Sequence, residues 1–175
     1  MSIYWRWRTA PVSMSTLEGE QAMAAPRVHV LNGPNLNLLG VREPHLYGHQ
    51  TLRDVERLCQ AVAERHGLEL LCRQTNAEYQ MIDWLQEARQ DAGIVINPAA
   101  FSYHSVPVLD AMKMCECPIV EVHITNIHRR EAEWRAKSIL TAAATGMISG
   151  LGIHGYPLAL EHIAHLHAQS ASKRV

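Results

Sequence analysis

The sequence contains no hydrophobic run that approaches the roughly 20 residues needed to span a membrane. It also has almost no net charge, because 16 Lys and Arg residues are interspersed with 17 Asp and Glu residues. The Lys-Arg pair at 173–174 is too short to form an extended basic surface. We therefore expect neither nucleic acid nor a membrane as a partner.

Cysteine is scarce, and the four residues of this type show no disulfide framework: Cys59, Cys72, Cys115 and Cys117. The Cys-Glu-Cys triplet at 115–117 can be read as half of a metal or redox site. Partner ligands are missing, so we predict reduced cysteines that serve packing. His104, His123 and His128 are not spaced as a His-x-x-x-His pair, and no cysteine ligand set accompanies them, so we predict no metal site.

Residues 1–26 differ from the rest of the chain. They contain a Trp-Arg-Trp-Arg stretch without the apolar segment that a secretory signal requires. We predict a disordered extension, or an upstream start codon with Met14 or Met23 as the true start. The remaining length suits one domain, which we place at 27–168, with a C-terminal tail at 169–175.

Short apolar segments alternate with amphipathic ones along this domain. The apolar segments predict five strands, at 28–31, 68–72, 94–96, 119–122 and 147–148. The amphipathic segments predict helices at 51–66, 78–91, 106–114 and 156–167. This alternation is typical of an α/β fold with a parallel sheet and right-handed crossovers.

Polar residues follow the predicted strands, where ligands bind in such sheets. The side chains expected at this edge are Asn32, Asn35, Arg42, Tyr47, Asn76, Asn97, Ser102, Tyr103, His104, Glu121, His123, Thr125, Asn126 and His154. Each asparagine alone is typical of a turn. Together these residues indicate an uncharged polar site rich in hydroxyl contacts.

Glu121 and His123 are two residues apart on a predicted strand, so their side chains share a face. A carboxylate behind an imidazole fixes its tautomer and favours its protonated form, which makes a general acid. The alternative is a histidine that merely caps a turn at the strand end.

Arg42 and Tyr47 lie in the loop after the first strand. A free tyrosine, with a pKa of about 10, is a poor base at neutral pH. A neighbouring guanidinium favours the phenolate and lowers that pKa, which makes a better base. The alternative is a solvent-facing arginine and a packing tyrosine.

A base, an acid and amide groups indicate proton abstraction beside a carbonyl, followed by loss of a leaving group. Asn35 can orient a water or donate to an enolate oxygen. The glycines at 150, 152 and 155 match a dinucleotide-binding fingerprint only weakly, because no βαβ unit follows them.

Motifs at 32–40, 42–48, 96–98, 121–126 and 144–156 together resemble the type II 3-dehydroquinate dehydratases. The resemblance implies a flavodoxin-like three-layer fold with a five-stranded parallel sheet, in a cytoplasmic homododecamer built from trimers. It implies a cofactor-free lyase that converts 3-dehydroquinate to 3-dehydroshikimate by anti elimination through an enolate, in the shikimate pathway or in quinate breakdown.

The same resemblance assigns roles to individual residues. Tyr47 takes the proton with help from Arg42, Asn35 holds a water at the enolate, and His123, backed by Glu121, protonates the leaving hydroxyl. Asp110 reaches a neighbouring subunit's site, and Arg130 belongs to a lid. The substrate-binding residues are Asn97, His104, Ile124, Thr125 and Arg135.

Three features depart from the family pattern. Tyr103 stands where the family has its substrate-binding histidine, and a histidine follows one residue later, at His104. Either the loop shifts to present His104, which we name as the binding residue, or the Tyr103 hydroxyl substitutes. Thr125 replaces a serine, and the segment 126–135 is one residue longer than usual.

Two other functions compete with this interpretation. The departures allow a catalytically altered paralogue that acts on a related cyclic polyol acid. A flavodoxin-like module that binds a nucleotide or flavin is the other rival, but Pro34 removes an amide donor from the loop where a phosphate would bind.

Overall fold

The computed structural model describes residues 24–42 and 48–172, and it contains one five-stranded sheet. The strands are β1 (Arg27–Asn32), β2 (Glu69–Gln74), β3 (Gly93–Asn97), β4 (Ile119–His123) and β5 (Gly146–Ser149). Their order is β2-β1-β3-β4-β5, and every neighbouring pair is parallel. This is the flavodoxin-like order, so the predicted fold class is confirmed.

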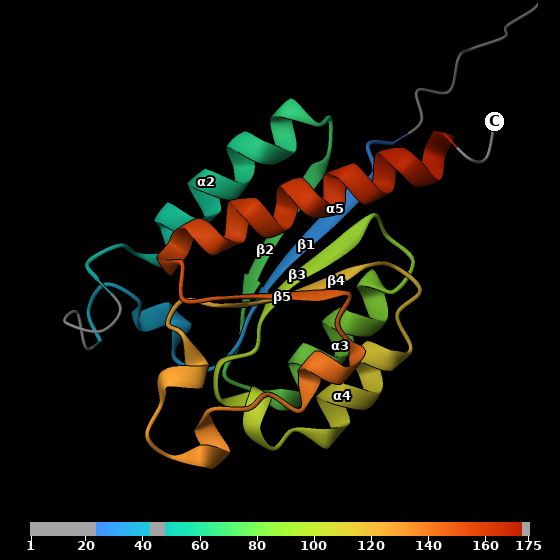
Figure 1. Ribbon diagram of the computed structural model, residues 1–175. Helices are drawn as coiled ribbons and strands as arrows, with labels where there is room; N and C mark the ends of the chain where they lie inside the picture. The colour runs from blue at the N-terminus through green and yellow to red at the C-terminus, as the bar shows by residue number, and fades with distance from the viewer. Residues whose placement is uncertain (1–23, 43–47, 173–175) are drawn as a thin grey trace, which may run out of the picture.

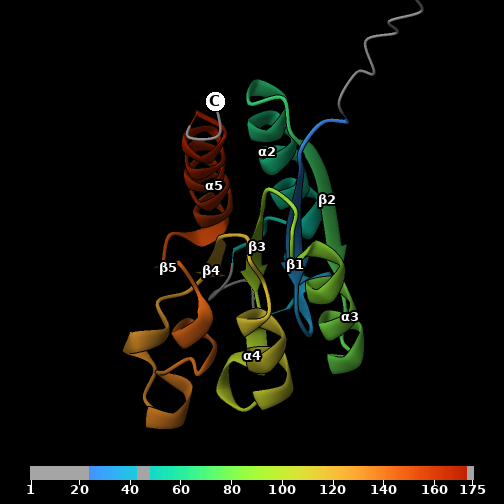
Figure 2. The same ribbon diagram turned by 90° about the vertical axis from the view of Figure 1, so that its right-hand side faces the viewer.

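Helices cover both faces of the sheet and give three layers (Figure 1). One face carries α2 (Leu52–Arg65) and α5 (Gly155–Ser172), and the other carries α3 (Glu78–Ala88) and α4 (Val106–Lys113). Figure 2, a view along the sheet, separates the two helix pairs clearly.

Local side-chain chemistry sets where these helices begin. Thr51 and Asp54 form a capping box at the start of α2: the Thr51 Oγ1 accepts from the Asp54 amide, and the Asp54 carboxylate accepts from the Thr51 amide. Ser105 caps α4 by accepting from the amide of Val108 at 3.1 Å.

Two predicted helix ends are wrong. α3 ends at Ala88 rather than at residue 91, because Asp91 turns back to β1, where its Oδ2 lies 2.6 Å from Nε2 of the buried His29. α5 runs on to Ser172, and its last turn is supported by the Ser172 hydroxyl, which donates to the Ala168 carbonyl at 3.0 Å. Residues 169–172, which we expected in a tail, are therefore helical.

The side chains of β4 alternate between the two layers. Val120 and Val122 pack with Tyr156, in the cluster that also contains buried residues of α2 and α5. Ile119 packs on the opposite side, in the cluster of α3 and α4. Glu121 has the same parity as Ile119, so the alternation turns a carboxylate toward the second face.

Among the described residues, no helix is long and apolar enough to cross a membrane. The predicted N-terminal extension falls mostly on residues 1–23, which lie outside the described part of the chain, and it stays a prediction.

Candidate active site

A cavity of about 150 Å³ opens beyond the carboxyl ends of β1, β3 and β4. This is the edge of the sheet at which the sequence predicted a site. Nine of the candidate site residues named from the sequence line it: Asn35, Arg42, Asn97, Tyr103, His123, Ile124, Thr125, Arg130 and Arg135. Apolar walls are added by residues of the loops after β1 and β3, among them Leu36, Leu39, Ala99 and Ala100.

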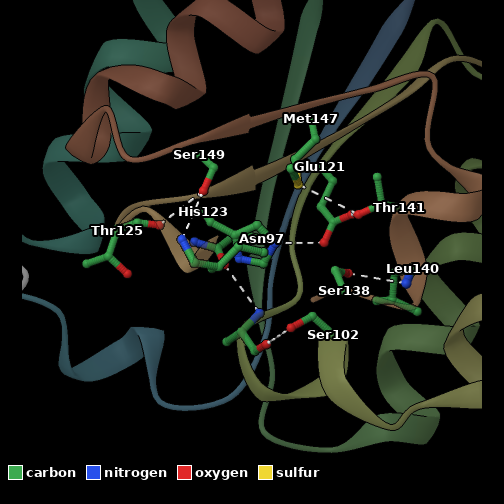
Figure 3. A network of polar contacts seen from close by, with 12 residues as sticks. Asn97, Ser102, Glu121, His123, Thr125, Ser138, Leu140, Thr141, Met147 and Ser149 are labelled. Carbon is green, nitrogen blue, oxygen red and sulfur yellow. Dashed lines mark hydrogen bonds and ion pairs between the residues drawn. The ribbon is translucent and has the colours of Figure 1, made fainter. Parts of the chain in front are cut away.

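The pair predicted on β4 is formed. Nε2 of His123 lies 2.7 Å from Oε1 of Glu121, and the two side chains are only 4% and 0% exposed (Figure 3). His123 lines the cavity, whereas Glu121 lies behind it. With Glu121 ionised, Nε2 donates its proton in a hydrogen bond to the carboxylate, which leaves the other ring nitrogen, Nδ1, for a ligand in the cavity.

The second oxygen of Glu121 is also engaged. Oε2 accepts a 2.6 Å hydrogen bond from the Thr141 hydroxyl (Figure 3). Burial alone raises the pKa of Glu121, but hydrogen bonds from His123, Ser138 and Thr141 outweigh it and hold that pKa below its ordinary value. The carboxylate therefore stays ionised behind the imidazole, although it has no contact with solvent.

A buried chain of hydrogen bonds holds Asn97 in the cavity wall. The Asn97 Nδ2 donates to the Tyr156 hydroxyl at 2.7 Å, and that hydroxyl donates to Oδ1 of Asn32 at 2.8 Å. Burial raises the pKa of Tyr156, which keeps the phenol protonated and able to donate. Asn97 Oδ1 accepts from the Ala99 amide, which leaves one Nδ2 hydrogen for a ligand.

The loop after β1 is held close to the loop after β3. The Gly33 amide donates to the Asn97 carbonyl at 2.8 Å, and a Cβ at Gly33 would lie 2.3 Å from the Pro98 carbonyl oxygen. Only glycine fits this approach. The next residue but one, Asn35, takes a left-handed conformation (φ 66°) and donates its amide to Asn76 Oδ1 at 2.9 Å.

The glycine-rich turn after β5 supports β4 instead of forming a phosphate cradle. The amide of Gly150 donates to the His123 carbonyl and that of Gly152 to the Ile124 carbonyl, both at 3.0 Å. Gly150 has φ 90°, and a Cβ there would lie 2.9 Å from Asn126 Cβ. These amides are already used, which argues against the nucleotide-binding interpretation.

The opening of the cavity is cationic. Arg42 reaches it from the loop after β1, and Arg130 and Arg135 from the segment after β4. The Arg130 Nη2 donates to Thr125 Oγ1 at 3.2 Å. Tyr47, the predicted base, lies outside the described residues, so its place beside Arg42 stays a prediction.

Two residues to which the resemblance gave substrate-binding roles do not line the cavity. His104 is exposed and absent from the cavity wall, which contains Tyr103 instead. The loop after β3 forms a 3-10 turn (Ala99–Tyr103) that places Tyr103, and not His104, in the cavity wall, so a binding role for His104 stays a prediction that this arrangement does not support. Asp110 is also exposed, with its carboxylate 3.8 Å from Lys113 Nζ.

Sequence reasoning missed the residues that hold the catalytic pair and the cavity wall. Thr141 and Ser138 lie in the irregular segment before β5, where no periodicity indicates which way a hydroxyl points. Tyr156 was expected only as the start of a helix. Among residues 24–42 and 48–172, no group of three or more His, Cys, Asp or Glu side chains is arranged to hold a metal ion.

The fold and the site together define a flavodoxin-like α/β enzyme that works by acid–base chemistry on a small anionic substrate. A buried imidazole paired with a carboxylate, together with amides, hydroxyls and three guanidinium groups, lines the cavity.

Comparison with known proteins identifies the family. Residues 26–164 match the model of the family described as dehydroquinase class II, and the chain belongs to this family. It is 54% identical over 143 residues to 3-dehydroquinate dehydratase 2 of Agrobacterium fabrum, covering 81% of this chain and 97% of the relative. It is 54% identical over 142 residues to 3-dehydroquinate dehydratase of Methylobacterium radiotolerans, covering 81% and 95%. The crystal structure of type II dehydroquinase from Propionibacterium acnes superposes with a TM-score of 0.74 at 42% identity, covering 81% and 97%.

Proposed function

We propose that the chain dehydrates 3-dehydroquinate to 3-dehydroshikimate at the cavity beyond β1, β3 and β4. Membership of the dehydroquinase class II family supports the reaction. The observation that carries the assignment of the site is the 2.7 Å contact between Glu121 and His123 at the wall of a cavity with three arginines. The net change is loss of a carbon-bound proton and a hydroxyl group as water.

In this proposal Tyr47 removes the proton next to the substrate's carbonyl group. Arg42 assists because a guanidinium favours the phenolate. The carbonyl oxygen becomes an enolate oxygen, and Asn35 stabilises that charge through a bound water. His123 then donates its proton to the departing hydroxyl, while the ionised Glu121 stabilises the imidazolium before the transfer. Reprotonation of His123 and release of the Tyr47 proton restore the starting state.

The cavity wall offers complementary contacts for the rest of the substrate. Arg135 provides a cation for the substrate carboxylate. Asn97 offers its remaining amide hydrogen, and Thr125 its hydroxyl, to the ring hydroxyls. Ile124 adds a buried wall beside them.

The direct test is an ultraviolet assay for the conjugated enone product with the wild-type chain and with Tyr47→Phe and His123→Asn. Wild type should form product, and each variant should lose roughly 10²- to 10⁴-fold in kcat. Tyr79→Phe is a matched control, because Tyr79 is 69% exposed on α3 and absent from the cavity wall. Absence of product from wild type would exclude the reaction; a fully active Tyr47→Phe would exclude only the assigned base.

A related cyclic polyol acid is the alternative substrate that the departures from the family pattern raised, and the relatives, named 3-dehydroquinate dehydratase, do not favour it. Tyr103 in the cavity wall, where the resemblance implies a histidine, is the feature that calls for a test. Competition assays decide between the two. A polyol acid turned over with a higher kcat/KM than 3-dehydroquinate would favour the altered paralogue.

We also propose that the chain assembles as a homododecamer of trimers in the cytoplasm. The family resemblance supports the assembly, and the exposed Asp110 is then available to a neighbouring subunit's site. Four free thiols suit a reducing compartment. Light scattering at assay concentration tests the assembly, and a monomer with full activity would remove Asp110 from the site.

A further inference from the structure

Two side chains from the segment after β4 contact one ring from the loop after β3. The Arg130 guanidinium carbon lies 5.6 Å from the centroid of the Tyr103 ring. The Trp134 ring meets the same tyrosine at a centroid distance of 5.4 Å and an interplanar angle of 84°, which is an edge-to-face pair. Both geometries are favourable.

Tyr103 follows a buried and hydrogen-bonded part of the loop after β3. Its neighbours Phe101 and Ser102 are buried, and the Ser102 hydroxyl donates to the Ala99 carbonyl at 2.7 Å. The Ser102 carbonyl accepts from the Ile139 amide at 2.9 Å, which ties this loop to the chain that follows residue 135. The ring is thus a fixed point at the opening of the cavity.

The segment at 127–135 is anchored at its start, where Ile127 is fully buried and its amide donates to Ser149 Oγ at 3.2 Å, whereas its later residues lie at the surface. It contains two short 3-10 turns, Ile127–Arg129 and Glu133–Arg135, and Trp134 is 67% exposed despite its contact with Tyr103. Nη1 of Arg130 lies 3.4 Å from the Arg135 carbonyl oxygen, to which it donates, so the position of one arginine is linked to that of the other.

We propose that Tyr103 is a positioning residue that holds Arg130, and through it Arg135, at the opening of the cavity before substrate binds. In this role the Tyr103 ring acts through Arg130, whereas the histidine that the family resemblance implies at this position would contact a substrate hydroxyl directly. Affinity for a carboxylate-bearing substrate then depends on Tyr103 through the two guanidinium groups. This consequence for affinity rests on the function proposed above, whereas the effect on the segment does not.

The kinetic test compares Tyr103→Leu with Tyr103→Phe. Loss of the ring should raise KM about tenfold and leave kcat within about twofold, whereas phenylalanine should keep KM near the wild-type value because it retains both ring contacts. In Tyr103→Leu/Arg130→Ala the increase in KM should match that of Arg130→Ala alone. Equal losses in the Phe and Leu variants would overturn the proposal, because the hydroxyl would then be the binding group.

The second test needs no substrate and stands even if the dehydratase assay fails. Trypsin cleavage after Arg129, Arg130 and Arg135 is followed by mass spectrometry in wild type and variants. Tyr103→Leu should be cut several-fold faster in this segment and Tyr103→Phe at the wild-type rate. Tyr79→Leu, which removes an exposed tyrosine from α3, is the control for a ring lost elsewhere. Unchanged cleavage in Tyr103→Leu would overturn the proposal.

Discussion

The two walls of the cavity are built in different ways. On the β4 side, Glu121 and His123 are buried, and each oxygen of the carboxylate has its own donor. Elsewhere in the lining, Arg130 and Arg135 belong to a segment of short turns at the surface, where Arg130 contacts the Tyr103 ring. The first wall resists rearrangement because an unpaired buried charge costs several kcal/mol. The second can be loosened by changing a single exposed contact.

This difference separates two contributions to the reaction. In the function proposed above, the buried wall, formed by Glu121 and His123, holds the acid and should mainly affect kcat. The surface wall, formed by Arg130 and Arg135, supplies charge for binding and should mainly affect KM. The following substitutions test this distinction, in order of decreasing expected effect.

The largest effect is expected for His123→Asn on the buried wall. Removal of the general acid should lower kcat about 10²- to 10⁴-fold with little change in KM. Arg135→Gln on the surface wall should mainly raise KM. Steady-state kinetics of the two variants measure both parameters, and a kcat loss of equal size in Arg135→Gln would break the distinction.

The next largest effect is expected for Thr141→Val. The change removes the 2.6 Å hydrogen bond to the Glu121 carboxylate, so the free energy of unfolding should fall by about 2–3 kcal/mol at pH 7. Urea denaturation measures this loss, and Thr141→Ser, which keeps the hydroxyl, should recover most of it.

The Thr141→Val effect should also depend on pH. The pKa of Glu121 is depressed in the folded state, so its contribution to stability is present above the ordinary glutamate pKa of 4.5 and is lost as the pH falls through the lower folded value. The difference between wild type and variant should therefore shrink below pH 4.5. A difference that grows on acidification would contradict an ionised Glu121.

Tyr156→Phe should have a smaller effect on stability. It leaves the buried Asn97 Nδ2 and Asn32 Oδ1 without the phenol between them, at a cost of about 1–2 kcal/mol. Thermal unfolding measures that cost. The kinetic signature should be an increase in KM, since Asn97 loses its support; unchanged KM would show that Asn97 is held by the backbone alone.

The smallest effect is expected for Lys137→Gln. Lys137 pairs with Glu133 at 2.8 Å on the exposed side of the surface wall, and such pairs contribute little. Kinetics and melting temperature should both stay at wild-type values. A measurable rise in KM would mean that this pair helps to position Arg135.

The sequence predicted the buried wall better than the surface wall. The contact between Glu121 and His123 followed from the two-residue period of a strand, which is a geometric rule. The position of His104 was not predictable because the 3-10 turn before it has no such period, so only the folded loop shows that Tyr103 faces the cavity. Thr141 lies twenty positions after Glu121, beyond a segment of short 3-10 turns, and no local pattern predicts their contact.

The elements of the fold were also predictable only in part. Strand positions were predictable from short apolar runs between turn residues. The ends of α3 and α5 were not predictable. Asp91 lies beyond the end of α3 and contacts His29 on β1, and the serine hydroxyls in the last turn of α5 donate to carbonyls of the same helix. Termini are decided by such individual contacts.

The alternation of β4 has an evolutionary consequence. Inserting or deleting one residue between Ile119 and Glu121 would turn every later side chain of the strand to the other layer. The Glu121 carboxylate would then enter the apolar cluster that contains Val120 and Val122. We therefore expect no change of length in this strand to be accepted, because it would abolish catalysis and folding together. The neighbouring segment at 126–135 has no such alternation, so a change of length there would leave the side chains of β4 in their layers.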